Sequence, residues 1–240
     1  QVGTNYANDY QDGVRGTDDV RVGPMRLVAS GAKPAAAVKR AALLAFGVAA
    51  VFGLALAIAV GPELLVVGAL SFAAGWLYTG GPKPYGYLGL GEVFVFVFFG
   101  LVATVGSAYV HTGEVTALVA CAAIPVGLLA TALLVVNNLR DIPTDTEAGK
   151  RTMAVRLGDR VTRIAYVTML VDVFLLVVVL AVTARWPALL GLAGLPLAIA
   201  PIRQVRGGAV GPALIPVLGA TGRVQLVTGL ALALGLALGG

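Results

Sequence analysis

The chain has 240 residues, of which 58% are hydrophobic and only 12% are charged, and its mean hydropathy is +0.91. Soluble globular domains contain about 25% charged residues. This composition therefore excludes a soluble domain and indicates an integral membrane protein.

The first residues of the chain have the pattern of a helix that runs into a loop. Asn5, Asp9 and Asp12 follow the spacing i, i+4 and i+7, which places them on one helical face. Gly13 and Gly16 come directly after them and are predicted to end the helix.

Seven apolar stretches follow, and most approach the roughly 20 residues that a transmembrane helix needs. The second, sixth and seventh are short, but a helix packed against neighbours can span a thinner region of bilayer. We therefore predict an all-α, polytopic transmembrane helical bundle with seven complete spans. The stretches are 35–60, 64–78, 93–109, 115–136, 161–183, 187–201 and 224–238.

Two of the segments between these spans are rich in polar residues. The first carries Lys83 among three tyrosines, with too many Gly and Pro for a regular helix. Lys83 either anchors the chain at the interface or contacts a substrate phosphate, and its position alone leaves both open. The second, 137–160, is longer than an ordinary connection, and Pro143 is predicted to end or kink the helix that enters it.

The basic residues predict the orientation. If the first span runs from inside to outside, all 17 Lys and Arg except Arg185 fall on the inner segments or the helix ends beside them. Such a bias marks the cytoplasmic face. The net charge of +5 is therefore a topology signal and a substrate-phosphate signal, not one for nucleic acid binding. The inner segments are 1–34, 79–92, 137–160 and 202–223.

Acidic residues gather in two stretches on that same face. Residues 5–19 contain four of the 12 and residues 137–151 contain three, seven in all. Carboxylates at this density repel one another unless a cation lies among them. Hard carboxylate oxygens flanked by Arg and Lys suit Mg²⁺ that holds a phosphorylated substrate. At a membrane face, this combination predicts chemistry on a lipid diphosphate.

Three isolated residues give weaker signals. Asp172 lies near the middle of a predicted span, where a carboxylate is a functional candidate, but we interpret it as a structural hydrogen-bonding residue. Cys121 lies inside a span and excludes a disulfide framework. His111 lies in an outer loop, away from both acidic stretches.

The motifs resemble the UbiA superfamily of intramembrane aromatic prenyltransferases. The pattern Asn8-xxx-Asp12 with Asp9, followed by Asp141-xxx-Asp145, is similar to the two motifs of that superfamily. The resemblance implies nine helices in the full protein, with the motifs ending helices two and six. The chain opens at Gln1 without an initiator Met or signal peptide. We therefore expect 1–240 to be one N-terminally truncated transmembrane prenyltransferase domain.

Longer strings resemble the 1,4-dihydroxy-2-naphthoate polyprenyltransferase branch of menaquinone biosynthesis. They are Asn5-Tyr-Ala-Asn-Asp-Tyr-Gln-Asp12, Gly81-Pro-Lys-Pro-Tyr-Gly-Tyr87 and Asn137-Asn-Leu-Arg-Asp-Ile-Pro-Thr-Asp145. The resemblance implies transfer of a polyprenyl group from polyprenyl diphosphate onto the naphthoate ring, with loss of CO₂ and diphosphate, to give demethylmenaquinone. It places a multi-pass enzyme in the cell (inner) membrane with its active site at the cytoplasmic face, and implies no obligate protein partner.

The same resemblance assigns residues to the site. One Mg²⁺ is expected on Asn8, Asp9 and Asp12, with either Asp18 or Asp19 completing this first metal site. A second Mg²⁺ is expected on Asp141 and Asp145. Catalytic roles are expected for Asp12, Asp141 and Lys83. Contacts with substrate are expected from Asn5, Lys83, Tyr85, Asn138, Arg140, Lys150 and Arg151.

Other functions remain as alternatives. One keeps the superfamily and changes the aromatic acceptor. A CDP-alcohol phosphotransferase also uses clustered aspartates, but its Asp/Gly/Ala-Arg motif is missing. A membrane permease usually places its polar residues near the bilayer midplane, and here only Asp172 is central.

Overall fold

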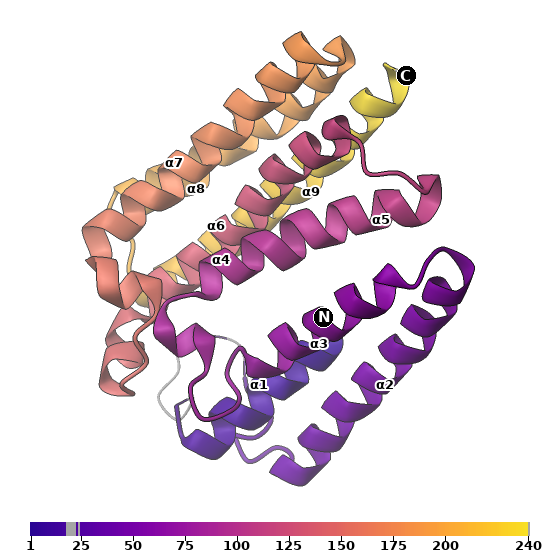
Figure 1. Cartoon of the computed structure of the whole chain (residues 1–240). Helices are drawn as coiled ribbons and strands as arrows, with labels where there is room; N and C mark the ends of the chain where they lie inside the picture. The colour runs from indigo at the N-terminus through magenta and orange to yellow at the C-terminus, as the bar shows by residue number, and fades with distance from the viewer. Residues whose placement is uncertain (18–22, 24, 240) are drawn as a thin grey trace. The chain divides into compact units, whose positions relative to one another are not determined.

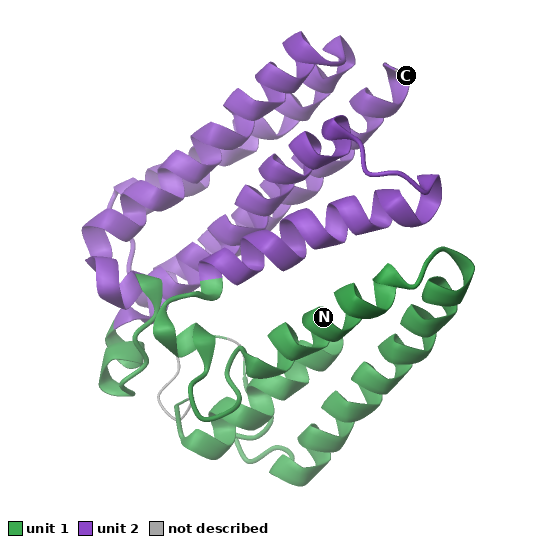
Figure 2. Cartoon of the chain, viewed as in Figure 1, with its two compact units in different colours: residues 1–91, 143–153 green, residues 92–142, 154–240 purple. Residues whose placement is uncertain are grey.

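Helices make up the regular structure of the described part of the chain, which covers residues 1–17, 23 and 25–239 of a computed structural model. The chain forms two compact units, one of residues 1–91 and 143–153 and the other of residues 92–142 and 154–240 (Figure 2). Asp18 and Asp19, the candidates to complete the first metal site, lie outside the described residues.

The first unit contains three packed helices and one short 3-10 turn (Figure 1). Phe46 joins them, because its ring lies edge-on to Phe72 at 5.5 Å and to Trp76 at 6.4 Å. A Cβ added at Gly3 would come within 3.1 Å of the same ring, so a small residue allows the first helix to pack there. The elements are α1 (Val2–Arg15), α2 (Ala35–Ala59), α3 (Glu63–Leu77) and η1 (Tyr85–Leu88).

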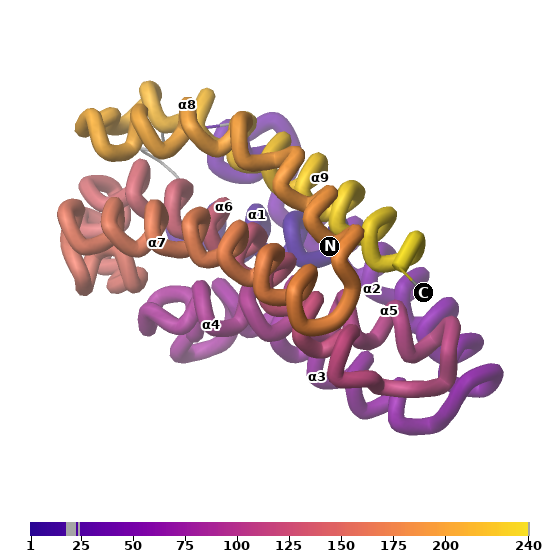
Figure 3. Tube along the Cα trace, turned by 90° about the horizontal axis from the view of Figure 1, so that it is seen from above, coloured from indigo at the N-terminus to yellow at the C-terminus, as the bar shows by residue number. Residues whose placement is uncertain are grey.

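The second unit is a longer helical bundle. Its core is made by apolar side chains from α6, α7, α8 and α9, among them Leu129, Leu170 and Val224. Figure 3 shows α8 running beside α9, in agreement with their packing. The elements are α4 (Gly91–Val95), η2 (Phe96–Val102, a π-helix), α5 (Ala103–Thr112), α6 (Ala117–Glu147), α7 (Met153–Thr183), η3 (Trp186–Gly194), α8 (Leu195–Arg206), η4 (Gly211–Leu214) and α9 (Ile215–Leu238).

Small residues let two segments of this unit approach closely. A Cβ added at Gly100 would lie 2.4 Å from the Cα of Gly127, and one added at Gly127 would lie 2.8 Å from the ring of Phe96. Membrane helices use Gly in this way because lipid tails provide no hydrophobic force that presses helices together. Buried polar groups also pair, since the hydroxyls of Tyr166 and Thr221 are 2.6 Å apart.

The predicted all-α membrane bundle is confirmed. Within the described chain, six segments are long and apolar enough to cross a membrane, and they correspond to six of the seven predicted stretches. The other stretch, 64–78, forms the shorter apolar helix α3. Many large apolar side chains on these helices are exposed, Ile58 by 80% and Val182 by 81%, as lipid-facing positions require.

Two residues that were expected near helix ends lie inside helices. Gly13 lies inside α1, and Gly16 alone ends it, with φ 73° and its N–H directed at the carbonyls of Asp12 and Gly13. Pro143 does not end α6, which continues to Glu147, because a proline removes one hydrogen bond and the turns on either side still hold. Most of the expected 137–160 loop is therefore helical.

The last spans begin earlier or end later than predicted. α7 begins at Met153, and Gly158 interrupts its first turns with φ 77° and ψ 168°. α9 begins at Ile215, after the 3-10 turn at Gly211–Leu214. Hydropathy located the apolar centres of these helices and missed their first turns, which in α7 carry charged residues such as Arg156 and Asp159.

Candidate functional site

The carboxylate of Asp12 is the centre of a hydrogen-bond network in the first unit. α1 carries this residue to a position where it is only 3% exposed. Its Oδ1 accepts a hydrogen bond of 2.8 Å from the hydroxyl of Tyr87. The Thr17 hydroxyl lies 3.1 Å from the Tyr87 hydroxyl and donates to the backbone carbonyl of Asp12 at 3.2 Å. Asp12 is therefore held in one orientation from two sides.

The ring of Tyr87 lies against two cations. The Arg15 guanidinium is 5.5 Å from the ring centroid and the Lys150 ammonium is 5.2 Å from it, distances that suit cation–π attraction. Burial raises the pKa of the Tyr87 hydroxyl above its ordinary range, and the nearby charge of Asp12 raises it further. The phenol is thus a stable donor to Asp12.

Lys150 joins the two acidic stretches. Its ammonium is 3.8 Å from Asp145 Oδ1, and its backbone N–H donates to the Asp145 carbonyl at 2.8 Å. The Thr152 hydroxyl donates to Asp145 Oδ2 at 3.4 Å. The structure therefore brings Asp12 and Asp145 into one network of the first unit through Tyr87 and Lys150.

Asp9 has a different environment from Asp12. Its Oδ2 accepts from the backbone N–H of Leu27 at 2.9 Å, and its Oδ1 accepts from that of Val28 at 3.0 Å. Each oxygen of this carboxylate, which is 6% exposed, thus binds the segment that follows α1. Asp9 holds that segment in place, whatever further ligand it takes.

Asn8 belongs to a second set of buried polar groups. The Thr79 hydroxyl lies 2.8 Å from Gln11 Oε1 and 3.1 Å from Asn8 Oδ1. Arg15 donates to the carbonyls of Thr79 and Gly81. These contacts attach the loop after α3 to α1.

Three further predicted substrate contacts are in this unit. Asn5 is exposed on α1, and Lys83 is exposed with no hydrogen bond or ion pair to any described residue. Tyr85 donates from its hydroxyl to the Ala74 carbonyl at 2.7 Å, and burial raises its pKa. Lys83 is therefore available to an anion, whereas Tyr85 is engaged with the protein.

In the second unit, Arg140 and Asp141 form a bidentate ion pair. Arg140 Nε is 2.6 Å from Asp141 Oδ1, and Nη2 is 2.7 Å from Oδ2. Nη2 also donates to Asn137 Oδ1 at 2.9 Å. The Arg140 side chain is fully buried, yet its Nη1 has no hydrogen-bond partner in the described chain. A buried guanidinium N–H without a partner is costly, and a phosphate oxygen would satisfy it.

Asn138 and Glu92 form the other polar contact near this end of α6. The Asn138 amide donates to Glu92 Oε1 at 2.9 Å, and Glu92 Oε2 has no hydrogen-bond partner in the described chain.

Arg151, a further predicted substrate contact, is exposed in the turn between α6 and α7. Asp172 is half-buried in α7, and no hydrogen bond to it occurs in the described part of the chain.

The donor set fits a metal that is shared with a substrate. Within the described ranges, no group of three or more His, Cys, Asp or Glu lies close enough to hold a metal. Mg²⁺ bound to phosphates commonly takes only one or two carboxylates and keeps several waters. Asp12 on α1, and Asp141 and Asp145 four residues apart on α6, can each supply such a ligand.

Sequence reasoning missed several residues of the network. Tyr87, Thr79, Gln11 and Arg15 were not predicted as site residues, although Tyr87 and Gln11 lie within the quoted motifs and Arg15 lies beside one of them. The signal that could have found Tyr87 is the density of tyrosines around Lys83.

The chain matches the UbiA prenyltransferase family over residues 1–209. It is 51% identical to a 1,4-dihydroxy-2-naphthoate octaprenyltransferase of Mycobacterium leprae, over 100% of this chain and 81% of that protein. It is 49% identical to the Mycobacterium tuberculosis protein of the same name, over 99% and 81%. The Escherichia coli protein of that name is 42% identical over 66% and 54%. The chain is a multi-pass membrane protein that belongs to the UbiA prenyltransferase family.

Proposed function

We propose that this protein transfers a polyprenyl group from polyprenyl diphosphate to 1,4-dihydroxy-2-naphthoate, with loss of CO₂ and diphosphate, to give demethylmenaquinol, the reduced form of demethylmenaquinone. The main support is about 50% identity, along the full chain, to mycobacterial proteins that carry the name of this activity. Family membership argues against the permease alternative.

The network around Asp12 is the structural observation that carries the proposal. Tyr87 binds Asp12 and lies against Lys150, which is beside Asp145. Acidic residues that suit a cation and basic residues that suit a phosphate thus occur side by side. A diphosphate that departs with its charge needs both kinds of neutralisation.

Mg²⁺ is the cation that we expect, held by Asn8, Asp9 and Asp12 and by Asp141 and Asp145. When bound, it neutralises the departing diphosphate oxygens. Because both oxygens of Asp9 already accept backbone hydrogen bonds, we assign the main ligand role on α1 to Asp12.

Basic residues are proposed to bind the remaining phosphate charge. Arg140 has a buried N–H that lacks a partner, and Lys83 is exposed without a partner in the described chain. Lys150 and Arg151 follow α6 directly. A guanidinium that is already fixed by Asp141 is preorganised for a phosphate oxygen, so little side-chain entropy is lost on binding.

The reaction on the ring needs no strong general base. The bond between the allylic carbon and the diphosphate oxygen breaks, and the electron-rich ring carbon that bears the carboxylate forms a bond to the allylic carbon. The bond to the carboxylate then breaks, and its electron pair restores the aromatic ring as CO₂ leaves. The bundle of apolar helices keeps water from the allylic cation.

The enzyme is proposed to work in the cell membrane with this site on the cytoplasmic face. All Lys and Arg except Arg185 fall on one side of the predicted spans or at the helix ends beside it, and such a bias marks the cytoplasmic side.

The experiment supplies membranes that contain the protein with Mg²⁺, labelled prenyl diphosphate and 1,4-dihydroxy-2-naphthoate labelled in its carboxylate. We expect labelled demethylmenaquinol, recovered as demethylmenaquinone after oxidation by air, and one CO₂ released for each prenyl group transferred. Product with another aromatic acceptor, but none with the naphthoate, would keep the prenyl transfer and refute the assigned acceptor.

A further inference from the structure

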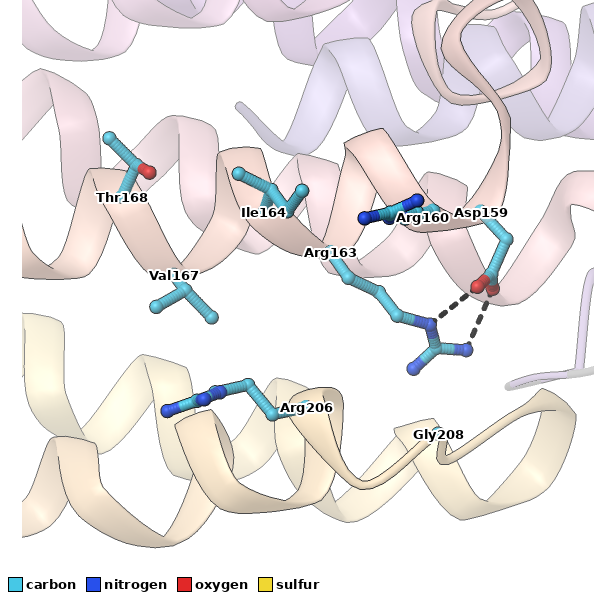
Figure 4. Close-up of a pocket in the computed structure, with 8 residues that line it drawn as sticks. All are labelled: Asp159, Arg160, Arg163, Ile164, Val167, Thr168, Arg206 and Gly208. Atoms are coloured by element: carbon cyan, nitrogen blue, oxygen red, sulfur yellow. Dashed lines mark hydrogen bonds and ion pairs between the residues drawn. The ribbon is translucent and has the colours of Figure 1, made fainter.

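A basic pocket lies in the second unit, between the first turns of α7 and the end of α8. It encloses about 440 Å³ and is lined by three arginines, Arg160, Arg163 and Arg206, together with Asp159, Ile164 and Val167 (Figure 4). None of the candidate site residues described above lines it.

Arg163 belongs to the framework of this pocket. Its Nε and Nη2 each lie 2.7 Å from an oxygen of Asp159. Its Nη1 donates to the Val205 carbonyl at 2.7 Å, and its Nη2 donates to the Ala209 carbonyl at 2.9 Å. Arg163 therefore ties α7 to the end of α8, and its charge is neutralised by Asp159.

Arg160 and Arg206 are left with their full charge. Both are exposed, and neither makes a hydrogen bond or ion pair within the described chain. No Asp or Glu follows Asp172 in the sequence, so α8 and α9 offer no counter-ion. Figure 4 shows Arg206 extending from α8 below Val167 of α7. An anion in the pocket would be attracted by both charges.

The pocket also has an apolar side. Ile164 is 55% exposed, and Val167 lies on the same helix one turn further into the span. Both α7 and η3–α8 are long and apolar enough to cross a membrane, and the pocket lies where the first begins and the second ends. Its ligand therefore combines a negative head with a hydrocarbon chain that runs along the helices into the bilayer.

We propose that this pocket binds the headgroup of an anionic phospholipid. Arg160 and Arg206 contact the phosphate, and one acyl chain lies against Ile164 and Val167. Basic pockets between membrane helices suit such headgroups, because each Arg near the surface adds to the attraction. The inference requires only that the chain spans the membrane and does not depend on the proposed reaction.

Native mass spectrometry of the purified protein, titrated with phosphatidylglycerol or with phosphatidylcholine, tests the proposal. The test variant is Arg160→Gln with Arg206→Gln. The matched control is Arg203→Gln with Arg223→Gln, which removes two exposed arginines from α8 and α9 outside the pocket. Thermal unfolding verifies that each variant is folded, and none of the four side chains has a partner in the described chain that its loss would strand.

We expect the Kd of the first phosphatidylglycerol to rise roughly tenfold or more in the test variant, because two charge-assisted contacts with the phosphate are lost, and to change less than about twofold in the control. An equal rise in both variants would show diffuse surface attraction and refute a site. Equal affinity for phosphatidylcholine would do the same. Displacement of the lipid by inorganic phosphate at matching concentration would show that the pocket takes free phosphate, not a lipid.

Discussion

Removal of the Tyr87 hydroxyl isolates the contact that orients Asp12. The Tyr87→Phe substitution keeps the aromatic ring and therefore both cation–π contacts, with Arg15 and with Lys150. It deletes the 2.8 Å hydrogen bond to Asp12 Oδ1 and the 3.1 Å contact with Thr17. The change thus separates orientation of the carboxylate from the surrounding charge.

The expected magnitude follows from the chemistry of that bond. A hydrogen bond to a charged group contributes about 1.5–3 kcal/mol, and Asp12 is almost fully buried, so water replaces the lost donor poorly. We take the lower part of that range because Tyr87 itself is only half-buried. The loss corresponds to a roughly tenfold to thirtyfold rise in the Mg²⁺ concentration that gives half-maximal rate.

The assay is the initial rate of prenyl transfer as a function of Mg²⁺ concentration at saturating substrates. Tyr10→Phe is the control, because Tyr10 lies on the same helix and its hydroxyl makes no hydrogen bond in the described chain. The control should keep the wild-type Mg²⁺ dependence. An unchanged Mg²⁺ dependence in Tyr87→Phe as well would refute the claim that Tyr87 positions a metal-binding carboxylate.

The effect of this substitution should not vary with pH in the neutral range. Burial raises the pKa of Tyr87, so the folded protein retains the phenol proton above the ordinary tyrosine pKa of about 10. The contribution is fully present below about pH 10 and is lost only as the pH rises through the higher value of the folded state. A rate ratio between wild type and variant that changed between neutral pH and about pH 9 would contradict this assignment.

Three other substitutions give separate expectations. Asp9→Ala should lower the free energy of unfolding by roughly 2–4 kcal/mol even without Mg²⁺, since two backbone N–H groups lose a charged acceptor. An unchanged melting temperature would contradict the structural role of Asp9 and leave it as a metal ligand alone. Gly100→Ala should destabilise the protein by about 1–3 kcal/mol, because its Cβ would meet backbone at 2.4 Å, whereas Gly106→Ala has open space and should be neutral in the same melting assay. Arg140→Lys keeps the charge but loses the bidentate contact with Asp141 and should reduce kcat/KM roughly tenfold to a hundredfold, measured by prenyl transfer.

Local spacing in the sequence predicted part of the site well. The i, i+4, i+7 pattern placed Asn5, Asp9 and Asp12 on a helix, and α1 has that helix. Hydropathy located the apolar centres of the spans. Both signals depend only on neighbours along the chain, which a single sequence displays directly.

Contacts between distant residues could not be predicted in the same way. The hydrogen bond of Tyr87 to Asp12 and the binding of Asp9 to Leu27 and Val28 depend on how the loops fold back on α1. Pro143 was predicted to end or kink α6; it does not end the helix, because the many hydrogen bonds on either side outweigh the one that a proline removes. The sequence indicated the chemistry of these residues, and the fold determines which of them share a ligand.

The most direct test of the account measures prenyl transfer by Asp12→Asn and Asp141→Asn, each against Glu114→Gln, an exposed acid in the loop between α5 and α6. Each Asn variant keeps the shape of the side chain and removes the charge that would bind Mg²⁺. We predict that both lose transfer by roughly a hundredfold or more, as expected when a buried charged partner is removed, while Glu114→Gln retains the wild-type rate. Wild-type transfer by either Asn variant, at the same Mg²⁺ concentration, would contradict the claim that these carboxylates hold the metal.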